Sequence, residues 1–171
     1  MGLDTVEIVM GWEAAFGIHI DDDEAFALRT PRMAIDLIAR KLGATDQPTP
    51  VCFSLRAFHR LRASVMSVTS VARRNFRPAA RLKDLATRGQ WDGIRSRCGI
   101  ASLPNPGWFS PRTVADLTRW TVIHAAKELK SAGEPWTRAE IRNIVRAVVE
   151  DTIGIRKFGD DDDFIKDLRV D

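Results

Sequence analysis

The chain has few of the residues that usually build metal centres or disulfide frameworks, and it has no long apolar run. Its two cysteines, Cys52 and Cys98, and its three histidines are scattered, so no zinc-like spacing exists and we expect no metal. We predict that both cysteines are small buried apolar groups in a reducing compartment. No apolar stretch approaches the ~18–20 residues of a membrane span, and no secretory signal is visible at the start, which favours a cytoplasmic protein.

Catalytic patterns are also missing. The serine, histidine and acidic residues form neither a nucleophile elbow nor a triad pattern, so we predict that the chain is not an enzyme and assign no catalytic residue. The acidic run Asp160–Asp163 lacks the ligand spacing and the distal glutamate of a calcium loop. We therefore expect it to be a solvated acidic loop.

The 171 residues are those of a soluble globular protein, 44% hydrophobic and 29% charged, but their charge is unevenly distributed. Residues 1–46 hold nine acidic and four basic residues, whereas residues 51–112 hold twelve basic and two acidic ones. This asymmetry indicates an acidic domain that is interrupted by a basic insert.

Helical periodicity and capping signals run through the sequence, and no segment is convincing as a strand, so we predict an all-α fold. Ile8, Trp12 and Phe16 recur every four residues and should form the buried stripe of the first helix. Thr137 and Glu140 form a capping box at the start of the last. The expected helices are residues 3–16, 21–26, 31–42, 53–73, 81–86, 91–97, 111–132 with Ser110 as its cap, and 137–153.

Two segments connect these helices, and two others are similar to each other in sequence. Residues 44–50 have the composition of a linker, and residues 99–111 should form a loop anchored by Trp108 and Phe109. FRPAARLKDLATR at 76–88 is weakly similar to FGDDDDFIKDLRV at 158–170. The similarity is too short to predict a repeat by itself.

The two ends of the chain carry a family resemblance. LDTVEIVM at 3–10 resembles the start of the second helix of acyl carrier proteins, and DFIKDLRVD at 163–171 resembles the segment that precedes that helix. Ile153-Gly154-Ile155 is similar to the turn after the family's first helix. The two halves stand in reversed order, so the resemblance implies a circularly permuted acyl-carrier-like bundle from residues 1–45 and 135–171, with a basic helical insert at 46–134.

One position departs from the family in a way that matters for chemistry. Acyl carrier proteins hold phosphopantetheine on a serine that opens the second helix, and Gly2 stands at that position here. Thr5, the nearest hydroxyl, lies one turn further on. We therefore expect no phosphopantetheine and no other cofactor. Arg169 also replaces a glycine of the family pattern.

The resemblance implies a function in fatty acid or lipid metabolism, as a non-carrying relative that binds partner proteins or acyl chains. The residues in the family's partner-recognition places are Leu3, Asp4, Val6, Glu7, Met10 and Glu13. Alternatively, Asp4 and Glu7 only suit the helix dipole. The tail should complete the bundle within one molecule, and the alternative is a domain-swapped homo-oligomer.

The basic insert supports a second hypothesis. Its arginines, with Trp91 and Trp108 available for stacking, have the composition of a helical module that binds nucleic acid or another anionic partner. No known nucleic-acid motif organises them, and packing against an acidic surface explains them as well. The candidate basic patch is Arg56, Arg60, Arg73, Arg74 and Arg77.

Overall fold

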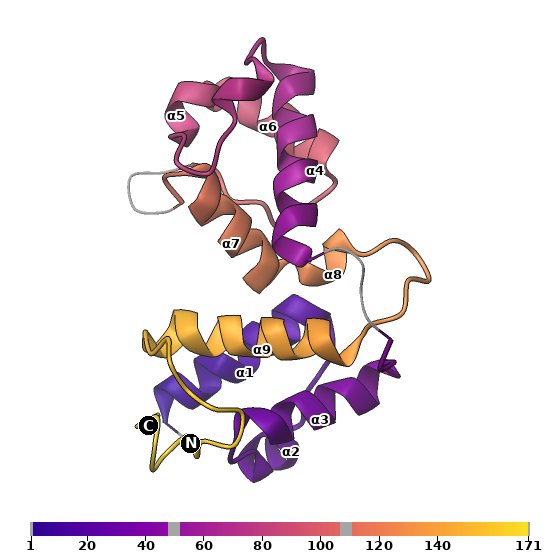
Figure 1. The fold of residues 1–171 in the computed structure, drawn as a ribbon, viewed down its shortest axis with the longest axis vertical. Coiled ribbons are helices and arrows are strands. Elements are labelled where there is room, and N and C mark those ends of the chain that lie inside the picture. Colours follow the sequence, from indigo (N-terminus) through magenta and orange to yellow (C-terminus); the bar gives the residue numbers. More distant parts are fainter. Residues whose placement is uncertain (1, 48–51, 107–110, 171) are drawn as a thin grey trace. The chain divides into compact units, whose positions relative to one another are not determined.

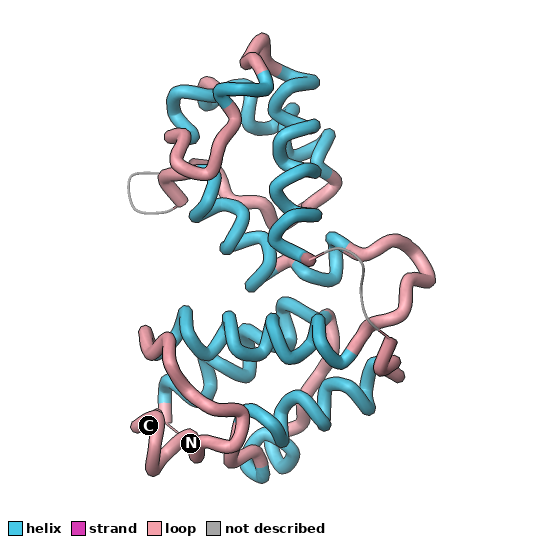
Figure 2. Tube along the Cα trace, in the orientation of Figure 1, coloured by secondary structure: helices cyan, strands magenta, loops and turns pink. Residues whose placement is uncertain are grey.

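The computed structural model describes residues 2–47, 52–106 and 111–170, and all regular elements within these ranges are helices (Figure 2). The all-α prediction is confirmed. The elements are α1 (Leu3–Phe16), α2 (Asp22–Ala27), α3 (Pro31–Leu42), α4 (Phe53–Val68), the 3-10 helix η1 (Arg73–Asn75), α5 (Leu82–Leu85), α6 (Arg88–Cys98), α7 (Val114–His124), α8 (Ala126–Leu129) and α9 (Arg138–Ile153).

The chain divides into two compact units. Unit 1 consists of residues 1–50 and 131–171, and unit 2 consists of residues 51–130. In unit 1, α9 packs against both α1 and α3, so elements from opposite ends of the sequence lie side by side (Figure 1). The indole Nε1 of Trp12 donates a hydrogen bond to the carbonyl of Val145 in α9 at 3.3 Å. Ile8, Trp12 and Phe16 are buried, as their spacing predicts.

Unit 2 is built around α4, which packs against α6 and α7. Its core contains Leu61 of α4, Ile94 of α6 and Leu117 of α7, and all three side chains are fully buried. These three helices therefore each turn apolar residues into the core of the unit.

Local signals fix most helix ends where the sequence predicts them. The hydroxyl of Thr30 accepts from the amide of Met33 at 3.3 Å, and the hydroxyl of Thr137 accepts from the amide of Glu140 at 3.2 Å. The carboxylate of Glu140 accepts in return from the amide of Thr137, which completes the predicted capping box. Gly17 adopts the left-handed conformation that ends α1.

Several expectations about the helices and cysteines are wrong. Helix α6 begins at Arg88 rather than at residue 91, because Thr87 and Gln90 form a capping box. α4 ends at Val68 rather than at residue 73, and the hydroxyl of Thr69 donates to the carbonyl of Val65 at its end. The helix expected at 111–132 is two helices, α7 and α8, and it begins after Thr113 because Thr113 and Asp116 form a capping box. Cys52 is exposed, whereas Cys98 is buried as expected. Ser110, Trp108 and Phe109 lie outside the described residues.

Candidate functional site

Helix α1 turns an apolar stripe into unit 1 and a second stripe toward solvent. Leu3 and Met10 are 70% and 60% exposed, and Val6 and Glu7 are exposed between them. Positions 3, 6, 7 and 10 follow the i, i+3, i+4, i+7 spacing, so these four side chains share one face. We call this set, Leu3, Val6, Glu7 and Met10, the α1 face. It combines three large apolar side chains with one carboxylate.

The other two predicted recognition residues lie elsewhere on the helix. Asp4 is half-buried in the first turn of α1. One carboxylate oxygen of Glu13 accepts from the backbone amide of Ile20 at 2.8 Å and lies 2.8 Å from Nδ1 of His19. Glu13 therefore holds the connector that follows α1, a local role that the sequence pattern did not indicate.

The N-terminus of α1 has no hydroxyl at its cap. Gly2 is the N-cap residue and makes no side-chain hydrogen bond. Thr5 lines a small cavity of about 10 Å³ together with Ile8, Trp12 and Val170. That volume is at or below the ~10–15 Å³ that a single water needs, so unit 1 is closed around this position.

The segment after α9 packs against α1. Phe164 is buried, and its ring lies 6.2 Å, centroid to centroid, from that of Trp12. Phe164 and Val170 line the same cavity as Thr5 and Ile8. Side chains from the start of α1 and from residues 164–170 therefore share one apolar cluster.

Arg169 has a backbone conformation that arginine seldom takes. Its φ is 56°, in the left-handed region that glycine adopts without steric cost. A glycine at position 169 would adopt this turn without steric cost.

Ion pairs of the acidic run Asp160–Asp163 hold the segment after α9 against α9 and α3. Asp160 pairs with Arg142 and, at 2.8 Å, with Arg146, both on α9. Burial alone would raise the pKa of Asp160, but the hydrogen bonds from Arg142 and Arg146 hold it below its usual value. Asp161 receives hydrogen bonds from Arg32 at the start of α3. The side chain of Asp160 is buried and ion-paired, so the expectation of a solvated loop is wrong for Asp160, whereas Asp161 pairs with Arg32 and stays exposed to solvent.

The end of the acidic run shapes its own turn. The carboxylate of Asp163 accepts from the backbone amides of Ile165 and Lys166, which lowers the pKa of Asp163. Within residues 2–47, 52–106 and 111–170, no group of three or more His, Cys, Asp or Glu side chains lies close enough to hold a metal ion.

The predicted basic patch contains residues with different structural roles. The guanidinium of Arg60 donates to the backbone carbonyls of Cys98, Gly99 and Glu128, so it ties α4 to the ends of α6 and α8. Arg56 donates to the carbonyl of Leu129 at 3.3 Å.

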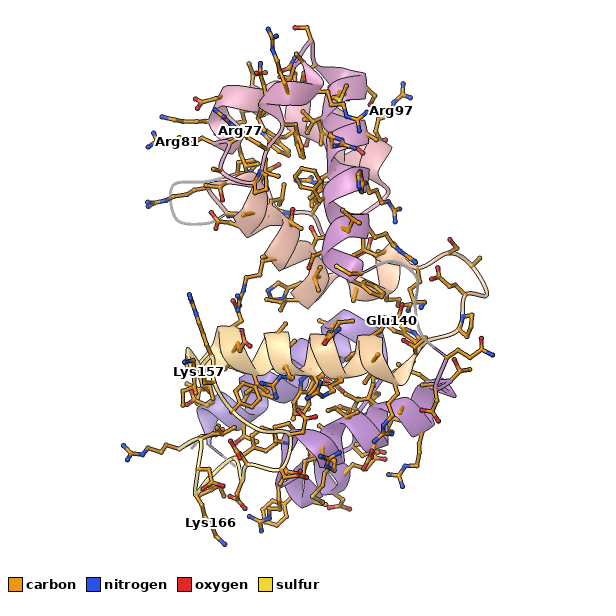
Figure 3. The ribbon with its side chains drawn as sticks, in the orientation of Figure 1. Arg77, Arg81, Arg97, Glu140, Lys157 and Lys166 are labelled. Atoms are coloured by element: carbon orange, nitrogen blue, oxygen red, sulfur yellow. The ribbon has the colours of Figure 1, made fainter. Side chains whose placement is uncertain are left out.

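The remaining members, Arg73, Arg74 and Arg77, are exposed in and after η1. Figure 3 shows other arginines of unit 2 on different sides: Arg81 extends on one side of the unit and Arg97 on the other. Basic charge is therefore spread around unit 2 rather than gathered on one described face.

Comparison with known proteins gives a partial similarity to acyl carrier proteins. The chain is 49% identical over 41 residues to acyl carrier protein 3, chloroplastic, of Cuphea lanceolata, which is 24% of this chain and 29% of that protein. It is 50% identical over 42 residues to the acyl carrier protein of Picosynechococcus sp. and 48% identical over 42 residues to that of Guillardia theta, in each case 25% of this chain and 52% of the relative.

The similarity thus spans about half the length of two of these relatives and less than a third of the other. No protein-family model matches the chain, and no solved structure matches it. In the part of the chain that the structure describes, no helix is long and apolar enough to cross a membrane.

Proposed function

We propose that unit 1 is a circularly permuted acyl-carrier-like bundle that docks partner proteins of fatty acid metabolism through the α1 face and carries no phosphopantetheine. The observation that carries this proposal is the α1 face itself. Leu3 and Met10 are large apolar side chains that stay exposed although α1 buries five other residues. Neighbouring exposed apolar side chains with polar residues at their rim mark protein-binding surfaces.

Two features of unit 1 support the permuted arrangement. The segment of residues 158–170 leads to the N-terminal end of α1, where Val170 and Thr5 line one cavity. The left-handed backbone of Arg169 occurs where acyl carrier proteins have glycine. The order α9, acidic segment, α1, α2, α3 is then the helix order of the family, closed into one bundle.

The absence of a hydroxyl at Gly2 supports the non-carrying part of the proposal, because a phosphodiester requires one. The small volume beside Thr5 supports docking of proteins rather than storage of an acyl chain in unit 1. Under this proposal the protein acts by occupying or recruiting a partner, and it has no catalytic step of its own.

A broad-specificity phosphopantetheinyl transferase is a suitable probe because it recognises carrier proteins. We expect it to bind the full chain in calorimetric titration, and we expect Glu7→Lys to weaken binding roughly tenfold, since one central interface residue contributes about 1.4 kcal/mol. Asp23→Lys makes the same charge change on exposed α2 and is the matched control. Equal affinities of the two variants, or no binding of the wild-type chain, would refute docking through the α1 face.

The same enzyme tests the missing attachment point. After incubation with coenzyme A, intact-mass analysis should show no added group on the wild-type chain and one added group on the Gly2→Ser variant. A gain of mass by the wild-type chain overturns the non-carrying part of the proposal. An unmodified Gly2→Ser chain counts against the permuted bundle.

A further inference from the structure

Unit 2 repeats a backbone arrangement of unit 1. In unit 1 the 16-residue helix α9 packs against α1 and α3, and in unit 2 the 16-residue helix α4 packs against α6 and α7 (Figure 1). The amide of Phe164, after α9, donates to the carbonyl of Arg29 at 2.9 Å. The amide of Leu82, after α4, donates to the carbonyl of Arg112 at 2.9 Å. Leu82 therefore holds the place of Phe164.

A second hydrogen bond fixes the same register. The amide of Arg32 donates to the carbonyl of Asp160 at 2.7 Å, and the amide of Ala115 donates to the carbonyl of Pro78 at 2.9 Å. Arg32 and Ala115 each lie two residues after the threonine that caps their helix, and Asp160 and Pro78 each lie four residues before the first donor. The segments that follow α9 and α4 therefore occupy equivalent places.

The charges of these two segments are opposite. In the shared register, Arg81 of unit 2 stands where Asp163 stands in unit 1. The whole of unit 2 follows this inversion, because it has fifteen Lys or Arg and four Asp or Glu, whereas unit 1 has eleven and nineteen. An excess of eleven positive charges on a small bundle costs stability through self-repulsion. A polyanion that binds unit 2 neutralises this charge.

Side-chain charges hold the segment of unit 1, but not that of unit 2. The carboxylates of Asp160 and Asp161 pair with arginines of α9 and α3, and that of Asp163 accepts from backbone amides. In unit 2 the side chains of Phe76 and Leu82 are buried, and backbone hydrogen bonds hold the segment. Its fold therefore depends on apolar burial and backbone bonds rather than on its cations.

Six cationic side chains in residues 73–88 are exposed and, within the part of the chain that the structure describes, have no hydrogen-bond or ion-pair partner. We call this set the basic segment: Arg73, Arg74, Arg77, Arg81, Lys83 and Arg88. Backbone hydrogen bonds from Phe76 to Arg73 and from Ala80 to Arg77 fold its first half into consecutive turns. These cations are therefore available to an anionic partner.

The composition of the basic segment favours phosphate groups over a protein surface. Five of its six cations are arginines, whose planar guanidinium matches a phosphate with two parallel hydrogen bonds. The buried centre of a protein interface is apolar. In the described part of unit 2, the large exposed apolar side chains are Leu55 and Met66, and both lie on α4 rather than in the basic segment. The partner of the basic segment is therefore rich in phosphate.

The aromatic residues closest to the segment in sequence favour a duplex over a single strand. Proteins bind unpaired strands by stacking the bases on aromatic side chains. Phe76 is 4% exposed and Trp91 is 3% exposed, so the expectation that Trp91 is available for stacking is wrong. A duplex keeps its bases stacked on one another and presents closely spaced phosphates, so it needs no such rings.

We propose that the basic segment of unit 2 binds the phosphate backbone of double-stranded nucleic acid. Six exposed cations without partners in the described chain, on a backbone arrangement that unit 1 builds with acidic residues, carry this proposal. Phosphate contacts hold no sequence information, so the binding is independent of sequence. This activity of unit 2 is separate from protein docking through the α1 face of unit 1.

Fluorescence anisotropy of the full chain with labelled duplexes of about 20 base pairs tests the proposal. We expect DNA duplexes of unrelated sequence to bind with equal affinity, and a single strand of the same length to bind more weakly because its charge density is lower. With about five phosphate contacts, affinity for the DNA duplex should fall roughly 500-fold between about 50 and 200 mM salt. A parallel titration with an RNA duplex shows which of the two duplexes is preferred.

Matched variants separate the basic segment from net charge. Arg73→Gln/Arg74→Gln removes two contacts and should reduce the slope of log affinity against log salt by about 2. Arg156→Gln/Lys157→Gln removes two neighbouring exposed charges from unit 1 and should leave the slope unchanged. Arg73→Lys/Arg74→Lys keeps the charge, so it should keep the slope of the wild-type chain.

Several results would overturn this binding mode. These are no binding of either duplex at about 50 mM salt, tighter binding of the single strand than of the duplex, or the same salt slope for the two glutamine variants. Binding of poly-glutamate in place of both duplexes would assign the basic segment to an acidic protein instead. None of these measurements involves the α1 face, so docking of the transferase is tested separately.

Discussion

Replacing Phe164 tests whether the segment after α9 completes the bundle that contains α1. Phe164 is 7% exposed and packs against Trp12, whereas its neighbour Ile165 is 59% exposed. Truncating a buried phenylalanine to alanine costs about 3–5 kcal/mol, and the lower end applies here because backbone hydrogen bonds still hold the segment. We expect Phe164→Ala to destabilise unit 1 by about 3 kcal/mol, more than a hundredfold in its folding equilibrium.

Native-state hydrogen exchange is the suitable assay because it measures the stability of each region separately. Amides of α9 should lose protection in Phe164→Ala, and amides of α4 in unit 2 serve as the internal reference. Ile165→Ala is the matched control and should stay within about 0.5 kcal/mol of wild type. If Phe164→Ala does not fold, Phe164→Leu should lower the free energy of unfolding by about 1 kcal/mol. Equal protection of α9 in the Phe164 and Ile165 variants would refute the packing of this segment on α1.

Three further predictions concern unit 1. Asp160→Asn should cost about 1.5 kcal/mol, because it removes the charge from two hydrogen-bonded ion pairs. Since the folded-state pKa of Asp160 is lowered, its stabilisation is present above the ordinary value of 3.8 and is lost as the pH falls through the lower folded value. Gly11→Ala should destabilise by about 1–3 kcal/mol, because a Cβ there would lie 2.7 Å from Val148 Cγ1. Arg169→Gly should stabilise by about 1 kcal/mol, because it relieves a left-handed backbone.

Each of these predictions has a measurement that can contradict it. An acid unfolding profile that is the same for Asp160→Asn and wild type would exclude Asp160 as a source of acid sensitivity. Gly89→Ala is the control for Gly11, since nothing lies within 4 Å of its Cβ, and the change should stabilise α6 by up to ~1 kcal/mol. Similar urea midpoints for the two glycine variants would argue against tight packing at Gly11. A lower midpoint for Arg169→Gly would show that the side chain of Arg169 contributes more than its backbone costs.

Helix positions in this protein were predictable where a strong local signal marks each end. The starts of α3 and α9 are marked by Thr30 before Pro31 and by Thr137 with Glu140, and both caps form as predicted. The sequence alone does not fix the start of α7, because Ser110 before Pro111 and Thr113 with Asp116 both have the residue types of a helix cap. The backbone bonds of residues 80 and 82 with residues 112–114 favour the second choice, and they are long-range contacts that no local pattern contains.

Only the part of the candidate site that local helix geometry determines could be predicted from the sequence. The 3.6-residue period places Leu3, Val6, Glu7 and Met10 on one face, because a helix fixes that geometry alone. The role of Glu13 depends on the path of the connector to Ile20, and that of Arg60 depends on carbonyls in α6 and α8. The two units share one backbone hydrogen bond at equivalent places, from Phe164 to Arg29 and from Leu82 to Arg112. The sequence does not reveal this match, because the Lys-Asp-Leu shared by the two segments is shifted by one residue relative to Phe164 and Leu82.

The hydrogen bond between Trp12 and Val145 joins residues 133 positions apart. Helix α9 likewise packs on α1 and α3 from the opposite end of the sequence. Unit 2 makes its contacts within 80 consecutive residues. On a growing chain, α1 to α3 emerge first, yet their apolar stripes stay uncovered until α9 has been synthesised. Unit 2 should therefore reach its native state before unit 1. The last and slowest step of folding should be the packing of α9 on α1 and α3, because it closes the longest loop in the chain.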